Sequence, residues 1–126
     1  MKHTPGFLAI VEDAKTRVSE TTAEEYAALL NTATPHVLID VREDSEWAAG
    51  HAVEAIHLGK GIIERDIESR QPAKDTLLIL YCGGGFRSAL AADALQKMGY
   101  TNVRSLAGGW RAWNEAGLPV EGPKTT

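Results

Sequence analysis

Cys82 and Arg87 are the residues of this sequence best suited to chemistry, and they bracket three glycines in the segment CGGGFR. Consecutive glycines allow a tight turn and keep side chains out of it, so that several N–H groups can point at one centre. Arg87 adds a permanent positive charge with a forked set of donors. Such a loop binds anions. Because a thiolate is itself an anion, the same field should produce a nucleophile at Cys82 near neutral pH.

The stretches on either side of this loop predict how it is held. Residues 77–81 are apolar without a break, which is typical of a strand covered on both faces in a parallel sheet. Apolar residues then recur at helical spacing from Phe86 to Met98, ahead of Gly99, and predict a helix that begins at about 86–88. Cys82 should therefore lie at the C-terminal end of a strand, where open α/β sheets bind ligands.

Three segments of the chain carry a resemblance to a known family. CGGGFRS resembles the active-site loop of rhodanese-type sulfurtransferases, in which the cysteine carries sulfur as a persulfide. The stretch LIDVREDSEWAAGHAVEAIHL is similar to the first signature of that family, although Glu54 stands where a glycine is commoner, and LAGGWRAWNEAGLPV is similar to its C-terminal signature. The resemblance implies an α/β fold, with a rhodanese-like open parallel sheet flanked by helices on both faces, in a single domain.

The chain of 126 residues suits one domain, since 44% hydrophobic and 24% charged residues are ordinary for a globular protein. We expect the rhodanese domain over residues 18–120. A helical extension should precede it at 1–17, with a helix over 5–15, and a flexible tail should follow at 121–126.

The predicted site centres on Cys82 as the catalytic residue. Asp40 and Arg42 follow the buried strand predicted at 37–39, and the resemblance implies that they support the fold around the active-site end: Asp40 through hydrogen bonds to loop backbone, Arg42 through pairing with carboxylates. The remaining candidates form the loop that binds the substrate anion: Gly83, Gly84, Gly85, Phe86, Arg87 and Ser88.

Histidines could assist the thiol, because an imidazole beside a cysteine can act as a base. In the family that the chain resembles, however, the loop activates the thiolate, so we expect buried, hydrogen-bonded roles for His51 and His57. Trp110 is expected to be a core or wall residue with some prospect of lining the pocket. The four histidines of the chain show no ligand spacing, and neither a metal site nor a cofactor is expected.

Composition also restricts the partners. The net charge of −4 argues against nonspecific nucleic-acid binding. The apolar run at 7–11 is too short for a membrane span, and no signal-peptide pattern surrounds it, so a cytoplasmic protein without membrane contact is expected, as a monomer or weak homodimer. A single cysteine excludes an intramolecular disulfide, so covalent chemistry at sulfur needs a small molecule or another protein.

The leading hypothesis is sulfur transfer by double displacement. Cys82 would take sulfur from a small anionic donor such as thiosulfate and pass it to a thiophilic acceptor, which is cyanide, a dithiol or a protein thiol. A phosphatase or arsenate reductase is the second hypothesis. Those enzymes resemble Cys-x5-Arg, whereas this chain has Cys-x4-Arg, and the narrower loop should fit a sulfane sulfur better. A non-catalytic rhodanese-like binding module is the third hypothesis.

Overall fold

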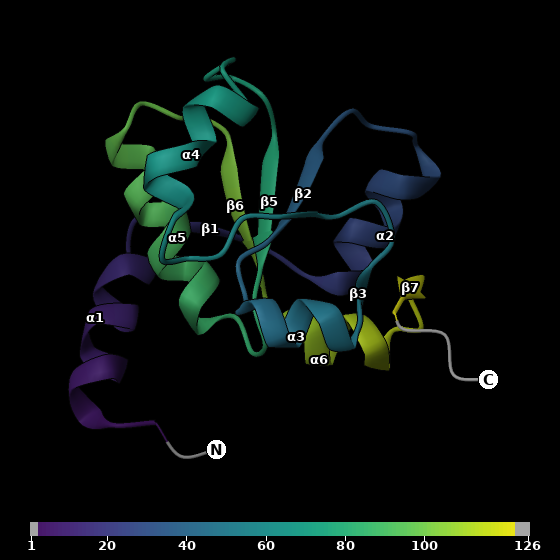
Figure 1. Ribbon diagram of the computed structural model, residues 1–126, viewed down its shortest axis with the longest axis horizontal. Coiled ribbons are helices and arrows are strands. Elements are labelled where there is room, and N and C mark those ends of the chain that lie inside the picture. Colours follow the sequence, from purple (N-terminus) through teal and green to yellow (C-terminus); the bar gives the residue numbers. More distant parts are fainter. Residues whose placement is uncertain (1–2, 123–126) are drawn as a thin grey trace.

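A parallel sheet of five strands forms the centre of the computed structural model, which describes residues 3–122 (Figure 1). The helices lie on both faces of this sheet, as the two separate hydrophobic clusters show. The α/β fold class predicted from the sequence is thus confirmed. The strands, in their spatial order, are β1 (Ser19–Thr21), β6 (Val103–Leu106), β5 (Leu78–Tyr81), β2 (Val37–Asp40) and β4 (Ile56–His57).

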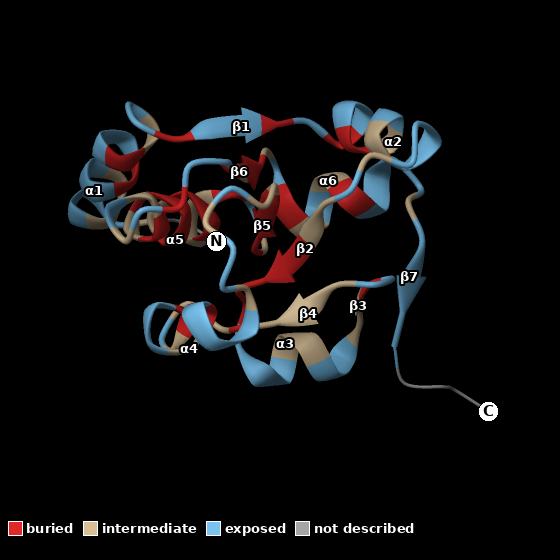
Figure 2. Ribbon diagram, turned by 90° about the horizontal axis from the view of Figure 1, so that it is seen from above, coloured by how far each residue is buried: buried red, intermediate tan, exposed pale blue. Residues whose placement is uncertain are grey.

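Strand β5 lies in the middle of the sheet, between β6 and β2, and all four of its residues are fully buried. Leu78 and Leu80 belong to one hydrophobic cluster, while Ile79 and Tyr81 belong to the other. Successive side chains of a strand point to opposite faces, so each face of β5 contacts its own layer of helices. This explains the unbroken apolar run in the sequence, and Figure 2 shows the buried residues concentrated in the central strands.

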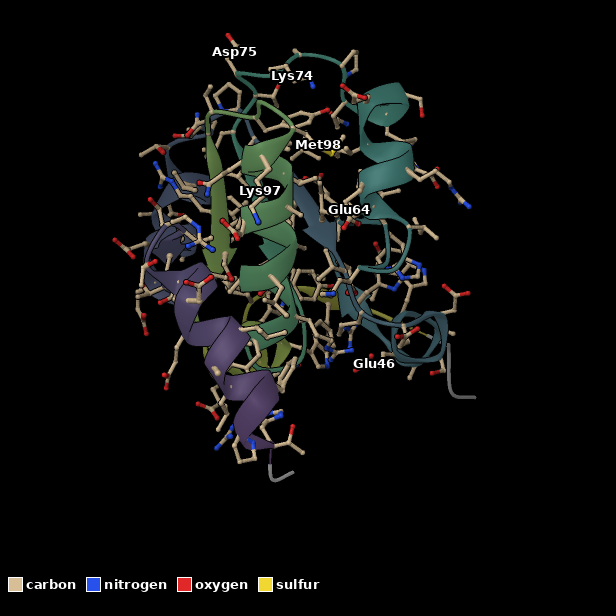
Figure 3. All side chains as sticks on the ribbon, turned by 90° about the vertical axis from the view of Figure 1, so that its left-hand side faces the viewer. Glu46, Glu64, Lys74, Asp75, Lys97 and Met98 are labelled. Carbon is tan, nitrogen blue, oxygen red and sulfur yellow. The ribbon has the colours of Figure 1, made fainter. Side chains whose placement is uncertain are left out.

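Three helices cover the first face. Helix α5 (Phe86–Lys97) buries alanines and Leu95 against the sheet, and α4 (Ile63–Arg70) buries two isoleucines. Helix α1 (Pro5–Lys15), which the sequence predicted with these bounds, packs on the outer side of α5. Lys74 donates to the Met98 carbonyl over 2.9 Å at the C-terminal end of α5. Figure 3 shows that Lys74 and Met98 lie toward one end of the molecule and Glu46 toward the other.

The second face is covered by α2 (Ala23–Asn31) and α6 (Gly109–Glu115). A capping box begins α2, with Glu25 N–H donating to Thr22 Oγ1 over 3.1 Å and Thr22 N–H donating to Glu25 Oε1 over 2.8 Å. Tyr26 is buried, whereas Leu30, in the last turn of the helix, is 40% exposed.

Two short strands close the side of the molecule next to α3 (Asp44–Ala49). Strand β3 (His51–Ala52) pairs antiparallel with β7 (Val120–Glu121). Glu121, which was assigned to the expected tail, is a member of β7, and residues 123–126 lie outside the described part of the chain. Within residues 3–122, every helix is too short or too polar to span a bilayer.

Candidate active site

Cys82 directly follows β5 and lies at the carboxyl end of the sheet, as predicted. Its side chain is almost fully buried, with 1% exposure. The Gly85 N–H donates to Sγ over 3.1 Å, and the Ser88 N–H lies at 3.4 Å from the same atom. Two backbone N–H groups at the start of α5 thus converge on the sulfur.

A pair of serines extends this set of hydrogen bonds into the protein. Ser88 Oγ lies 3.5 Å from the sulfur and 2.8 Å from Ser105 Oγ, where either hydroxyl can donate. Both serines are fully buried. Ser105 belongs to β6, which pairs with β5. Sequence reasoning missed Ser105, although a polar residue in a strand next to the cysteine strand was a signal for it.

The first turn of α6 holds the loop from the opposite side. Trp110 N–H donates to the Cys82 carbonyl over 2.7 Å, and Arg111 N–H donates to the Gly83 carbonyl over 3.2 Å. Gly109 has φ +52°, and a Cβ there would overlap the Cys82 carbonyl oxygen. The glycine pair of the C-terminal signature therefore permits a close approach of two backbones.

The three loop glycines are not equivalent. Gly85 has φ +96°, and a Cβ there would come within 3.2 Å of the Gly108 nitrogen, so this position requires glycine. A Cβ on Gly83 would come within 3.1 Å of Arg87 Nη2, whereas one on Gly84 would meet open space. The backbone conformation of the loop is thus set mainly by Gly85, while Gly83 leaves room for the Arg87 guanidinium.

Arg87 forms an ion pair with Glu46, a residue of α3 that sequence reasoning missed. Arg87 Nη1 donates to Glu46 Oε1 over 2.8 Å, and Nη2 donates to Oε2 over 3.2 Å. The hydrogen bonds from Arg87 lower the pKa of Glu46, and in return Glu46 raises the pKa of Arg87. The two side chains are about one-third exposed. The guanidinium at the loop is therefore already paired with a carboxylate.

The helix that carries Glu46 follows β2, and this explains how the carboxylate reaches the loop. Strands β2 and β5 are parallel neighbours, with Asp40 opposite Tyr81, so the segments that follow them meet at one edge of the sheet. Glu43 is the N-cap of α3. Its N–H donates to Glu46 Oε1 over 3.0 Å, which fixes the carboxylate on this side of the helix.

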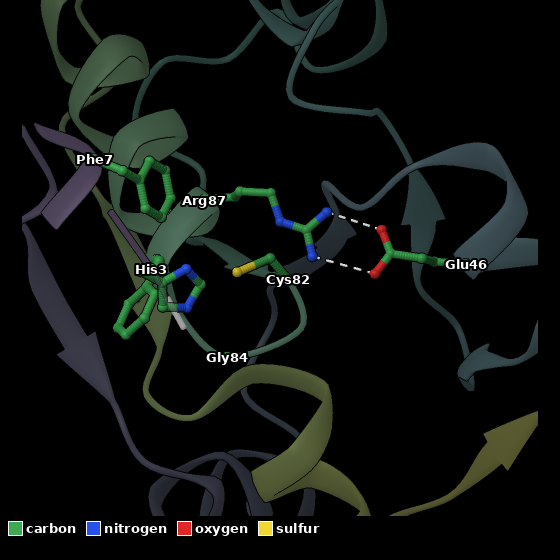
Figure 4. A pocket seen from close by; sticks show the side chains of 7 residues that line it. His3, Phe7, Glu46, Cys82, Gly84 and Arg87 are labelled. Atoms are coloured by element: carbon green, nitrogen blue, oxygen red, sulfur yellow. Dashed lines mark hydrogen bonds and ion pairs between the residues drawn. The ribbon is translucent and has the colours of Figure 1, made fainter. Parts of the chain in front are cut away.

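A pocket of about 450 Å³ opens above the thiol. Figure 4 shows the Cys82 sulfur pointing toward the side of this pocket where His3 and Phe7 lie, with the Glu46–Arg87 pair at the other side. His3 and Phe7 were not predicted as site residues, because they reach the pocket only through the docking of α1 on α5. The lining residues are His3, Phe7, Glu46, Cys82, Gly84, Phe86 and Arg87.

Asp40 and Arg42 do not line this pocket and instead form a buried ion pair beside it. Arg42 donates to Asp40 through Nη2 over 2.8 Å and through its backbone N–H over 2.9 Å, and it also donates to the Gly50 carbonyl over 2.6 Å. The Tyr81 hydroxyl donates to Asp40 over 2.6 Å and accepts from the Ala52 N–H over 3.0 Å. Burial disfavours the charge of Arg42, but Asp40 outweighs this effect and raises the pKa of Arg42.

The remaining candidates of the sequence lie outside the pocket. Trp110 packs over the Arg42 guanidinium at 4.6 Å. His51 stacks on Trp47 at 3.5 Å and donates to the Trp47 carbonyl, while His57 donates through Nε2 to the Arg42 carbonyl over 2.8 Å. The imidazole at the pocket is that of His3. In the part of the chain that the structure describes, no three metal-ligating side chains cluster together.

Comparison with known proteins agrees with this arrangement of loop and sheet. The family model of the rhodanese-like domain matches residues 22–116. A sulfurtransferase of Allochromatium vinosum is 33% identical over 107 residues, which cover 85% of this chain and 98% of that protein. Protein HIGH ARSENIC CONTENT 1, mitochondrial, of Arabidopsis thaliana is 33% identical over 132 aligned positions, covering 96% of this chain and 78% of that protein.

A solved structure extends the similarity to almost the whole chain. It is that of a protein of unknown function from Rhodopseudomonas palustris, described as a possible tyrosine phosphatase. It is 32% identical, with a TM-score of 0.81, and the alignment covers 96% of this chain and 98% of the other. Together with the family match over residues 22–116, these relatives show that the chain belongs to the rhodanese-like domain family.

Proposed function

We propose that this protein is a sulfurtransferase that carries a sulfane sulfur as a persulfide on Cys82. The observation that carries the proposal is the position of the Cys82 sulfur, at the inner end of a pocket and within 3.1 Å of the Gly85 N–H. A similar protein is named a sulfurtransferase. The donor is a small anion such as thiosulfate, and the acceptor is cyanide, a dithiol or another thiol.

The first half of the reaction forms the persulfide. The Cys82 thiolate attacks the outer sulfur of thiosulfate, a new S–S bond forms, and the bond within thiosulfate breaks. Sulfite leaves with the electron pair of that bond. The N–H groups of Gly85 and Ser88 stabilise the thiolate before the attack, and the loop donors then hold the charged persulfide.

The second half returns the thiolate. A nucleophilic acceptor attacks the outer sulfur of the persulfide, and the electron pair of the broken S–S bond stays on Cys82. Neither half needs a second cysteine, which suits a chain that has only one. Arg87, at the mouth of the loop, attracts the anionic donor and orients it.

The competing function is that of a phosphatase or arsenate reductase. Two similar proteins bear names that mention arsenic or a tyrosine phosphatase. A tetrahedral oxyanion needs several donors placed around its oxygens. Here both terminal nitrogens of Arg87 donate to Glu46, and only four residues separate Cys82 from Arg87. This geometry favours sulfur transfer. The presence of the thiol also disfavours a purely non-catalytic module.

Intact mass after incubation with thiosulfate tests the proposal directly. The wild-type protein should gain the mass of one sulfur atom, and dithiothreitol should remove it. Cys82→Ser is the control and should gain nothing. Hydrolysis of an aryl phosphate, measured on the same samples, should be negligible. A phosphatase activity without any sulfur adduct would reject the sulfurtransferase in favour of its competitor.

A further inference from the structure

One side of the pocket above Cys82 is formed by three aromatic rings, which we call the aromatic wall: His3, Phe7 and Phe86. The His3 ring meets Phe86 edge-on, with 4.4 Å between the ring centroids, and lies 5.3 Å from Phe7. The two phenylalanines stand 6.3 Å apart at 67°. All three side chains are partly exposed and line the pocket, so they form a surface that a ligand can contact. Figure 4 shows His3 and Phe7 on this side of the thiol.

The wall is held firmly in place, although His3 and Phe7 lie outside the region matched by the family model. Helix α1 buries Val11 and Ala14 against the domain. Just beyond it, Arg17 donates to Asp93 of α5 through Nε over 2.9 Å and through Nη2 over 2.8 Å. The two helices are thus fixed to each other by apolar contact and by a bidentate ion pair.

This pocket is larger and more apolar than a small inorganic anion requires. Its volume of about 450 Å³ lies within the range of roughly 300–1,000 Å³ that is usual for organic ligands. Thiosulfate is much smaller and entirely hydrophilic, so it gains nothing from contact with phenylalanine rings. An apolar group, in contrast, would displace water from the rings with a favourable free energy.

The position of the sulfur restricts the occupant further. Cys82 is only 1% exposed, so the thiol of a folded partner protein cannot approach it unless the pocket opens. A small molecule that enters the pocket can bring its sulfur to Cys82 while its remaining atoms rest on the aromatic wall.

We propose that the acceptor is a small organic thiol with an apolar body, aromatic or branched aliphatic, which the aromatic wall binds. This inference rests on the proposed function. The acceptor thiol loses its proton to solvent, and its sulfur attacks the outer sulfur of the Cys82 persulfide. A new S–S bond forms as the bond to Sγ breaks, and the electron pair stays on Sγ. The product is an organic persulfide.

The test compares two acceptors of similar thiol basicity, benzyl mercaptan and 2-mercaptoethanol, with protein that thiosulfate has loaded. We expect the wild type to have the lower KM for benzyl mercaptan. Phe7→Ala should raise that KM about tenfold, since it removes most of the contact with a ring, and should raise the KM for 2-mercaptoethanol by a much smaller factor. Ile10→Ala is the matched control, because Ile10 lies on the same helix but is 55% exposed.

A binding measurement keeps this inference separate from the proposed function. Calorimetric titration of the Cys82→Ser protein with benzyl mercaptan measures binding to the aromatic wall in the absence of sulfur transfer. Adding Phe7→Ala to this variant should weaken the binding by about the same factor as it raises the KM. Binding without any persulfide in the wild type would reject the sulfurtransferase but keep the aromatic wall as a ligand site. Equal KM values for both acceptors, or an unchanged KM in a folded Phe7→Ala protein, would overturn the inference.

Discussion

Two carboxylate–arginine pairs lie at the same edge of the sheet, and they differ in burial. In the Asp40–Arg42 pair the side chains are 0% and 4% exposed, and Tyr81 and Gly50 provide further hydrogen bonds. The Glu46 and Arg87 side chains are 35% and 31% exposed, and both line the pocket. A buried pair cannot lose a partner without leaving an uncompensated charge, whereas a half-exposed pair can separate and exchange its partner for a ligand.

The largest effect is expected when the buried pair is broken. Asp40→Asn keeps the shape of the side chain but leaves the Arg42 charge buried without a counter-ion, and it should lower the free energy of unfolding by about 3 kcal/mol or more. Urea unfolding measures this loss. Glu46→Gln is the matched control and should change the same quantity by less than about 1 kcal/mol. Similar losses in the two variants would remove the distinction between the pairs.

Removal of the half-exposed cation should affect the donor more than the fold. In Arg87→Ala the pocket loses its positive charge, so the KM for thiosulfate should rise about tenfold, which corresponds to the loss of one charge-assisted contact. The melting temperature should hardly change, because the side chain is partly solvated. Steady-state kinetics and thermal unfolding of the same sample measure the two effects. A large fall in melting temperature with an unchanged KM would show that Arg87 is a structural residue.

Removal of the half-exposed anion should have a smaller and opposite effect on the donor. Glu46→Gln eliminates a negative charge from the pocket and frees part of the Arg87 guanidinium, so the KM for thiosulfate should fall a few-fold, roughly threefold. Glu46→Asp, which retains the charge, is the control. If the KM rises instead, then the carboxylate positions Arg87 for the donor and does not compete with it.

The smallest effect concerns pH. Because Arg87 lowers the pKa of Glu46 below its ordinary 4.5, the ion pair stabilises the fold fully above about pH 4.5, and this contribution disappears as the pH falls through the lowered value. At this exposure it should stay below about 1 kcal/mol. The difference in unfolding free energy between wild type and Glu46→Gln, measured from pH 7 to pH 3, should therefore shrink on acidification. A difference that grows would contradict the assignment.

Much of the fold and the loop could be predicted from local patterns. The unbroken apolar run before Cys82 and the helical spacing after Arg87 correctly predicted the strand, the turn and the helix. The capping residues of α2 and the bounds of α1 also follow from local sequence. These features depend on neighbours in the chain, which is why a single sequence reveals them.

The rest of the site depends on contacts between distant segments. Glu46 lies 41 residues from its partner Arg87, and nothing in its local sequence distinguishes it from Glu43. His3 and Phe7 reach the pocket only because α1 docks on α5. Sequence reasoning favoured hydrogen-bonded roles over catalysis for His51 and His57, but it did not predict that both rings stack on Trp47. Where a side chain is placed by packing alone, spacing along the chain carries no signal for it.

The two amides that face the sulfur have a spectroscopic consequence. The Gly85 N–H donates directly to Sγ, and the Ser88 N–H points at the same atom from 3.4 Å. The resonance position of an amide proton responds to the charge of its acceptor, so the nuclear magnetic resonance signals of these two groups should differ between the thiol, the thiolate and the persulfide. In a ¹⁵N-labelled protein they would act as built-in reporters of the state of the sulfur, and would follow each half of a turnover without any attached probe.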